Sequence, residues 1–278
     1  MQPLIGLMAL FSVLIPQKIW FAPSQPLNVM VKADSALTLT LTDMADKQLA
    51  TASAKPGVDD LKQLFPAIAQ SGTYIVFAGT PTDFVGTPLV IEVRIDKQQG
   101  PTPQAVKVEP LCYVDMTTDM GKFTSVFYYD VAPNTVDNFL SLAAGGYYDG
   151  LTFHRILPGF VIQGGDPLGD GTGGPGYTIG DEFSDRQHLE GVLSMAHTGA
   201  PNSGGSQFFV CLDYNSTKHL DGGYAAFGKV VDGMDAVKKI AATPLSNPQA
   251  GTPVKAPVIQ KAEVLPVTKD HNPYAGAK

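Results

Sequence analysis

An arginine and a glutamine lie in a mostly apolar run, FHRILPGFVIQGGD, from Phe153 to Asp166. The run places the guanidinium of Arg155 and the amide of Gln163 among residues that are typical of a buried core. Burying such groups is costly unless they are hydrogen-bonded. Arg155 and Gln163 are therefore candidates for chemistry, while a surface ion pair on a strand is the competing interpretation of Arg155.

The run predicts a β-hairpin, because two short apolar segments flank the turn dipeptide Pro158-Gly159. Proline presets the first central turn position and glycine supplies positive φ at the second, which fits a type II turn. A two-residue connection pairs Arg155 with Ile162, and one added bulge residue brings Arg155 opposite Gln163. The spacing alone leaves both registers open.

The run resembles the signature of the cyclophilins, which are peptidyl-prolyl cis/trans isomerases. The resemblance covers residues from about 108 to 267 and implies a mostly β fold, an eight-stranded antiparallel barrel capped by two helices. Helices are expected over 134–144 and 233–242. Upstream of the run, residues 132–139 resemble the start of the family's first helix. Downstream of it, matching segments follow in the family's order at 171–174, 193–196, 202–209, 220–222 and 227–230.

The resemblance implies isomerisation of X-Pro bonds in proline-containing polypeptides, which assists protein folding and needs no cofactor. The obstacle is amide resonance, a barrier of roughly 18 to 20 kcal/mol. A donor near the prolyl nitrogen, in a dry apolar pocket, weakens the partial double bond. On this resemblance Arg155 is the catalytic residue, whereas His154 is structural because the reaction moves no proton.

The resemblance also implies a set of substrate-binding residues. Aromatic and aliphatic members form the proline pocket, the two glutamines hold the substrate backbone or orient Arg155, and two members offer main-chain hydrogen bonds to an extended peptide. Taken alone, each phenylalanine is more often core. The set is Phe160, Val161, Gln163, Ala196, His197, Gln207, Phe209, His219, Leu220 and Tyr224.

Two members depart from the best-known eukaryotic pattern. His219 stands where a tryptophan often lies, and Tyr224 stands where a histidine often lies. A tyrosine at that position also resembles bacterial members. His219 lacks the indole donor and area, which puts binding of the cyclosporin-type inhibitors associated with the family in doubt. Catalysis is less affected.

The composition is that of a globular protein: 278 residues, 44% hydrophobic, 16% charged, with a net charge of −7. The negative charge gives no reason to expect nucleic acid as a partner. Cys112 and Cys211 lie in apolar contexts typical of buried strands, and a disulfide between them stays open. No metal-ligand spacing links them to the five histidines.

The chain divides into five predicted parts. Residues 1–22 form an apolar segment whose core, 4–15, is too short to span a membrane; it resembles a signal peptide but lacks a preceding positive charge. An extracytoplasmic or periplasmic location and a cytoplasmic one therefore both stay open. A small β-sandwich-like domain over 23–96, a Pro/Gly-rich linker over 97–107, the isomerase domain over 108–268 and a solvated tail over 269–278 follow.

Three functions compete on these observations. The first is an active prolyl isomerase. The second is a proline-peptide binding module with incidental catalysis, whose first domain selects the partner, and the third is a structural scaffold. The presence of Arg155, Phe160, Gln163 and Phe209 favours the enzyme, since binding alone does not require the guanidinium.

Overall fold

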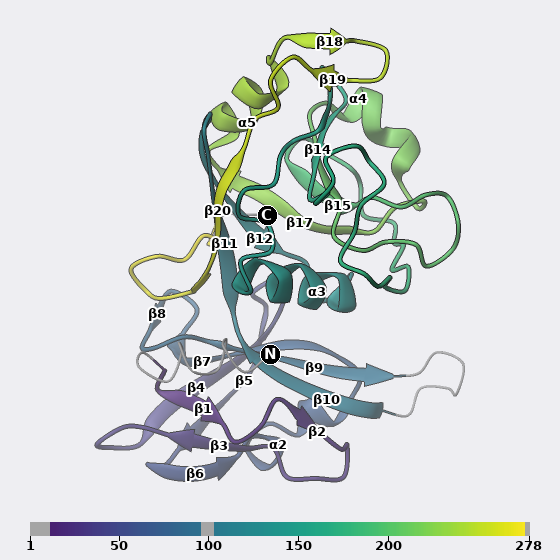
Figure 1. Ribbon diagram of the computed structural model, residues 1–278. Helices are drawn as coiled ribbons and strands as arrows, with labels where there is room; N and C mark the ends of the chain where they lie inside the picture. The colour runs from purple at the N-terminus through teal and green to yellow at the C-terminus, as the bar shows by residue number, and fades with distance from the viewer. Residues whose placement is uncertain (1–11, 96–102, 276–278) are drawn as a thin grey trace. The chain divides into compact units, whose positions relative to one another are not determined.

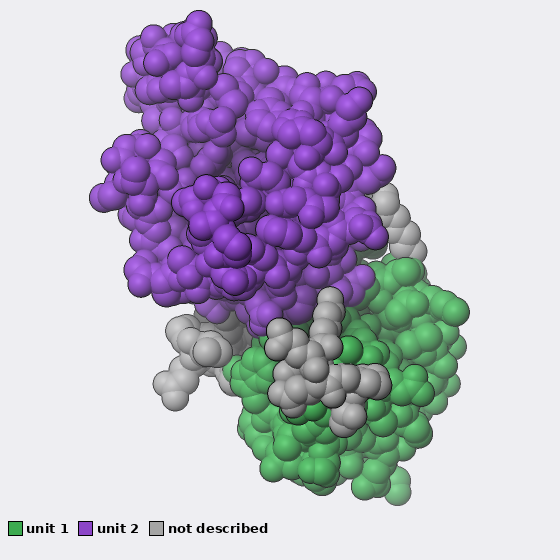
Figure 2. Space-filling view, turned by 90° about the vertical axis from the view of Figure 1, so that its right-hand side faces the viewer, with its two compact units in different colours: residues 1–112, 266–276, 278 green, residues 113–265, 277 purple. Residues whose placement is uncertain are grey.

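The computed structural model describes residues 12–95 and 103–275. These residues form two compact units, coloured separately in Figure 2: unit 1 contains the described residues up to 112 and from 266 onward, and unit 2 contains residues 113–265. Half of the predicted apolar segment, residues 1–11, lies outside the described residues. No helix of the described part is long and apolar enough to cross a membrane.

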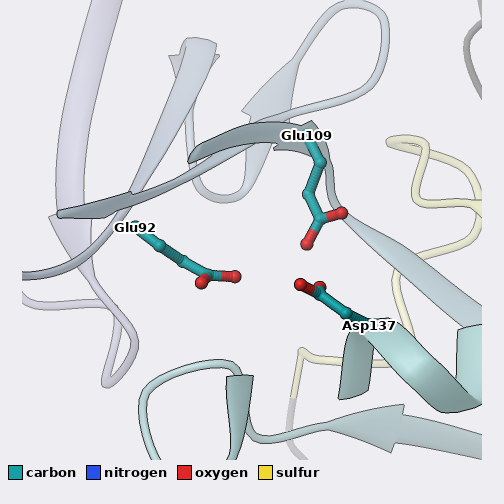
Figure 3. Close-up of side chains that lie close together, drawn as sticks. All are labelled: Glu92, Glu109 and Asp137. Carbon is teal, nitrogen blue, oxygen red and sulfur yellow. The ribbon is translucent and has the colours of Figure 1, made fainter. Parts of the chain in front are cut away.

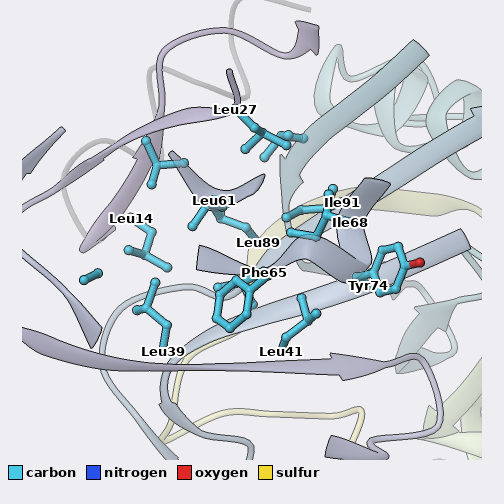
Figure 4. Packing of buried hydrophobic residues seen from close by; sticks show 14 of the residues in the cluster. Leu14, Leu27, Leu39, Leu41, Leu61, Phe65, Ile68, Tyr74, Leu89 and Ile91 are labelled. Atoms are coloured by element: carbon cyan, nitrogen blue, oxygen red, sulfur yellow. The ribbon is translucent and has the colours of Figure 1, made fainter. Parts of the chain in front are cut away.

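Unit 1 contains two β-sheets around one apolar core (Figure 1). Figure 4 shows leucines from different strands, such as Leu14, Leu39 and Leu89, facing Phe65. This is the sandwich-like arrangement that the alternating strands predict. One sheet has the order β1 (Leu14–Pro16), β3 (Asn28–Val31), β6 (Gly57–Asp60). The other has the order β2 (Trp20–Phe21), β10 (Pro103–Pro110), β9 (Leu89–Ile95), β7 (Gly72–Thr80), β4 (Leu37–Asp43), β5 (Gln48–Ala54), and β8 (Asp83–Phe84) pairs with β7. Two short helices, α2 (Leu61–Leu64) and the 3-10 helix η1 (Pro66–Ala69), lie between β6 and β7 in the chain.

The linker prediction differs from the structure in its second half. Residues from Pro103 form β10, an internal strand between β2 and β9, and Val106 and Val108 are buried in the core of unit 1. Proline is tolerated at the first position of a strand, so Pro103 does not interrupt the sheet. The tail prediction differs too, because the Tyr274 hydroxyl donates to the carbonyl of Cys112 at 2.7 Å.

Unit 2 is one curled eight-stranded sheet, antiparallel from β13 through to β11, with two main helices, as predicted. Phe139 of α3 packs on Phe127 and Phe227, with ring centroids 5.6 and 5.1 Å apart. Both cysteines are buried and free. The sheet order is β13 (Arg155–Leu157), β14 (Val161–Gly164), β16 (Phe208–Cys211), β15 (Val192–Met195), β17 (Ala226–Asp232), β12 (Gly121–Phe127), β11 (Cys112–Thr118), β20 (Ile259–Pro266). The remaining elements are α3 (Pro133–Ala144), α4 (Tyr214–Thr217), the 3-10 helix η2 (Lys218–Leu220), α5 (Met234–Ala241) and the hairpin of β18 (Leu245–Asn247) and β19 (Thr252–Pro253).

Helix α3 receives its N-terminal cap from a distant loop. Its N-cap residue, Ala132, has no side-chain acceptor, and the Glu182 carboxylate accepts instead from the backbone N–H groups of Asn134 and Thr135 at 3.1 and 2.8 Å. The Thr135 hydroxyl donates to the same carboxylate at 2.8 Å. Glu182 therefore satisfies N–H groups that the helix itself leaves without partners.

Replacing Glu182 by glutamine should lower the free energy of unfolding by about 2 kcal/mol, because one carboxylate oxygen becomes an amide that faces donors. Urea unfolding followed by circular dichroism measures the change. The matched control is Asp185→Asn at an exposed position of the same loop. Equal stabilities for the two variants would contradict the capping role.

Candidate functional site

The hairpin of β13 and β14 has the register with one added residue. Arg155 pairs with Gln163, and the connection contains three residues because Phe160 lies outside the register. The N–H of Phe160 donates to the carbonyl of Leu157 at 2.9 Å, and Gly159 has a φ of 74°. The type II turn chemistry is thus as predicted, and the extra residue brings the guanidinium and the amide together.

A chain of hydrogen bonds holds the Arg155 guanidinium. Its Nη1 donates to Oε1 of Gln163 at 3.0 Å, and Nε2 of Gln163 donates to Oε1 of Gln207 at 2.9 Å. Nε2 of Gln207 then donates to the carbonyls of Gly171 and Gly173 at 3.0 and 2.9 Å. Because carbonyls only accept, they fix the orientation of both amides, and the relay presents Oε1 of Gln163 to Arg155. The bond to Gln163 uses one N–H of a guanidinium that has five.

An apolar cluster lies beside this relay. Its centre is Phe209, which pairs with Gln163 across β14 and β16, and Val161 and Leu220 are buried with it. Phe160, Ala196 and Tyr224, all partly buried, pack against these residues.

The remaining predicted residues join the cluster through ring contacts. His219 stacks on Phe160 at 5.5 Å with 16° between the planes, and Tyr224 meets Phe209 edge-on at 5.6 Å. The ring of His197 lies 4.3 Å from that of Tyr224. The structure therefore brings all eleven predicted site residues into one connected region of unit 2.

His188 also belongs to this region, and the sequence analysis missed it. The ring is fully buried, stacks on Phe209 at 6.1 Å, and bonds Asp221 through Nδ1 at 2.9 Å and the Ser194 hydroxyl through Nε2 at 3.0 Å. The hydrogen-bonded series Asp221, His188, Ser194 resembles the catalytic triad of a hydrolase. Ser194 is fully buried, however, and offers no nucleophile to a substrate. The polar stretch before His188 carries no sequence signal of burial.

The stability of the protein should fall as the pH drops below about 6.5, the ordinary value for histidine. Burial lowers the pKa of His188, although Asp221 opposes the shift. The unfolded chain therefore binds more protons than the folded chain between the two pKa values, and the free energy of unfolding falls as the pH falls through that range. Urea midpoints at pH 7.5 and 5.0 measure the decrease.

The matched variant is His188→Gln, whose urea midpoint should depend less on pH. Burial lowers the pKa of His154 as well, so part of the dependence remains in that variant. An unchanged pH dependence in His188→Gln would contradict the assignment to His188.

We assign no metal site to the three carboxylates Glu92, Glu109 and Asp137, which lie outside this region. Figure 3 labels Glu92 on β9 and Glu109 on β10, both in unit 1, and Asp137 on α3 of unit 2. Glu92 is paired with Arg94 at 2.5 Å and Glu109 with Lys107 at 2.6 Å. Each of these two glutamates already has a cationic partner on its own strand.

Comparisons with known proteins agree with this geometry. Residues 113–264 match the family model described as cyclophilin type peptidyl-prolyl cis-trans isomerase/CLD. A peptidyl-prolyl cis-trans isomerase of Synechococcus elongatus is 53% identical over 117 residues, which are 42% of this chain and 79% of that protein. Peptidyl-prolyl cis-trans isomerase B of Bacillus subtilis is 50% identical over 125 residues, 44% of this chain and 85% of that protein.

Solved structures point the same way. The crystal structure of a Cryptosporidium parvum cyclophilin type peptidyl-prolyl cis-trans isomerase is 33% identical with a TM-score of 0.52, covering 56% of this chain and 98% of that one. A second structure of that protein, in the presence of the dipeptide Ala-Pro, has a TM-score of 0.51 and covers 56% of this chain and 99% of that one. Because more than half of this chain matches the family model, the chain belongs to the cyclophilin-type peptidyl-prolyl cis-trans isomerase family.

Proposed function

We propose that unit 2 catalyses rotation about X-Pro bonds in extended polypeptides with Arg155 as the catalytic donor. The observation that carries the proposal is the Arg155 guanidinium, held by the Gln163 amide beside a buried apolar cluster. A donor in that position can bond the prolyl nitrogen as it becomes pyramidal and loses conjugation. Each ~1.4 kcal/mol of stabilisation specific to the transition state accelerates the rotation tenfold.

The proline ring would occupy the apolar cluster. Phe160 and Phe209 form its walls, and Val161 and Leu220 form its floor. An apolar pocket excludes water, which strengthens the hydrogen bond from Arg155 and keeps the ring still while the carbonyl side rotates. The reaction moves no proton or electron, so the proposal includes no cofactor.

The peptide backbone would bind along the polar edge of the pocket. Gln163 and Gln207 orient Arg155 through the observed relay and can accept or donate to the substrate main chain. The main chain of Ala196 and His197 supplies the hydrogen bonds to the extended peptide. Main-chain recognition tolerates many side chains, and the Ala-Pro dipeptide present with the related Cryptosporidium protein supports proline-containing peptides as the substrate class.

His219 bears on inhibitor binding. Its ring covers Phe160 by stacking, but it is smaller than an indole and offers a different donor geometry. We therefore propose that cyclosporin-type inhibitors bind this chain weakly.

A protease-coupled assay on a short X-Pro peptide tests the proposal. The full chain should accelerate the cis-to-trans step well above the uncatalysed rate, which takes on the order of tens to hundreds of seconds. In parallel, the same peptide should shift the NMR amide signals of Val161 and Phe209. Peptide binding without acceleration would favour the binding-module function, and acceleration without shifts at this cluster would place the site elsewhere.

A further inference from the structure

The side chain of His197 joins two segments of the proposed peptide site. Its Nε2 lies 3.0 Å from the carbonyl oxygen of Gly223, and its Nδ1 lies 3.0 Å from the backbone nitrogen of Gly199. Gly199 belongs to the segment that starts at Ala196, just after β15. Gly223 belongs to the turn that precedes Tyr224. The imidazole therefore bridges the segment 196–199 and the turn that leads into Tyr224, a residue packed against the cluster.

The two partners determine which ring nitrogen carries the proton. The Gly199 N–H can only donate, so Nδ1 must offer a lone pair. The Gly223 carbonyl can only accept, so Nε2 must carry hydrogen. A neutral imidazole protonated at Nε2 satisfies both contacts at once.

The ring of His197 also packs toward the cluster, through Tyr224. It lies 4.3 Å from the ring of Tyr224 at 33°, and Tyr224 meets Phe209 edge-on at 5.6 Å. Phe183 packs on the ring of His197 at 5.7 Å. A displacement of His197 is therefore transmitted to Phe209 through a single intervening side chain.

We propose that His197 is a positioning residue whose side chain sets the spacing between the peptide-binding segment 196–199 and the proline pocket. The inference rests on the proposed function, which assigns that segment to the substrate main chain. An extended peptide can bond the segment and place its proline in the pocket only when the two lie at the right separation. Because Arg155 is held by a different relay, His197 governs substrate binding more than the rotation itself.

The variant His197→Phe keeps an aromatic ring against Tyr224 and removes both hydrogen bonds. We expect KM for an X-Pro peptide to rise about tenfold, with kcat changed less than about twofold. His197→Gln, whose amide offers one donor and one acceptor, should recover part of the loss. The control is His271→Phe, the same exchange at an exposed histidine of unit 1, with unchanged kinetics expected.

A second measurement, on the wild-type protein, determines the tautomer of His197. Long-range ¹⁵N–¹H correlation of the histidine rings in the full-length protein should show His197 with a protonated Nε2 and an unprotonated Nδ1. The opposite tautomer would overturn the inference, as would a fall in kcat at constant KM in His197→Phe. Failure of the proposed function looks different: the wild-type chain would itself give no acceleration above the uncatalysed rate.

Discussion

Replacing Arg155 by alanine should lower kcat/KM on an X-Pro peptide by about 10²- to 10³-fold, the loss typical of removing one preorganised donor to a transition state. Alanine leaves Gln163 and the apolar cluster in place, so the peptide still finds a pocket without a donor for the prolyl nitrogen. The loss should therefore fall mainly on kcat. The protease-coupled assay gives both constants.

Two comparisons separate this loss from a defect in folding. Arg155→Lys keeps the positive charge but lacks the planar fork that reaches Gln163 and the substrate together, so its activity should be intermediate. Arg155 is half-buried on an edge strand, and both variants should keep a urea midpoint close to that of the wild type. An Arg155→Ala enzyme with the wild-type rate would remove the guanidinium from the mechanism and leave the family fold untouched.

The fold of the cyclophilin-like unit can be predicted well from the sequence, because its turns, helices and strands are specified by residues that are close together in the chain. Pro158-Gly159 specifies the turn through the backbone angles of two residues. In the helices and strands of unit 2, the spacing of the apolar residues agrees with the turn residues at their ends. The strand partner of Arg155 could not be predicted from the sequence, because it depends on whether Phe160 belongs to the strand or to the turn. A single residue changes the partner from Ile162 to Gln163.

Features that depend on distant partners could not be predicted in the same way. His188 can be buried because Asp221 and Ser194 satisfy its two nitrogens, and Asp221 lies 33 residues further along the chain. The polar stretch before His188 gives no sign of this pairing. Strand β10 follows a segment rich in proline and glutamine, and only the valines at 106 and 108 show that it is internal. Composition identifies breaks in local structure, whereas burial follows from which strands pair.

A glycine remote in sequence supports β13, the strand that carries Arg155. The carbonyl of Gly251, in the turn between β18 and β19, accepts from the N–H of Ile156 at 2.7 Å, and Gly251 has a φ of 75°. A Cβ at this position would lie 2.7 Å from the carbonyl oxygen of Ile156 and 3.2 Å from Cγ of Arg155. The turn thus packs directly on the stem of the proposed catalytic residue, and only glycine leaves it room.

Gly251→Val should consequently reduce kcat/KM by about a hundredfold, the cost expected when a reacting group moves by roughly 1 Å. A β-branched side chain is strained at positive φ, and its contact with the backbone of β13 forces the strand to shift with Arg155. Gly150→Val is the matched control, because Gly150 has a φ of 85° and no atom within 4 Å of an added Cβ. Both variants share the backbone strain, and only the change at Gly251 displaces the guanidinium. Equal activity losses in the two variants would show that strain alone is responsible and that the turn does not position Arg155.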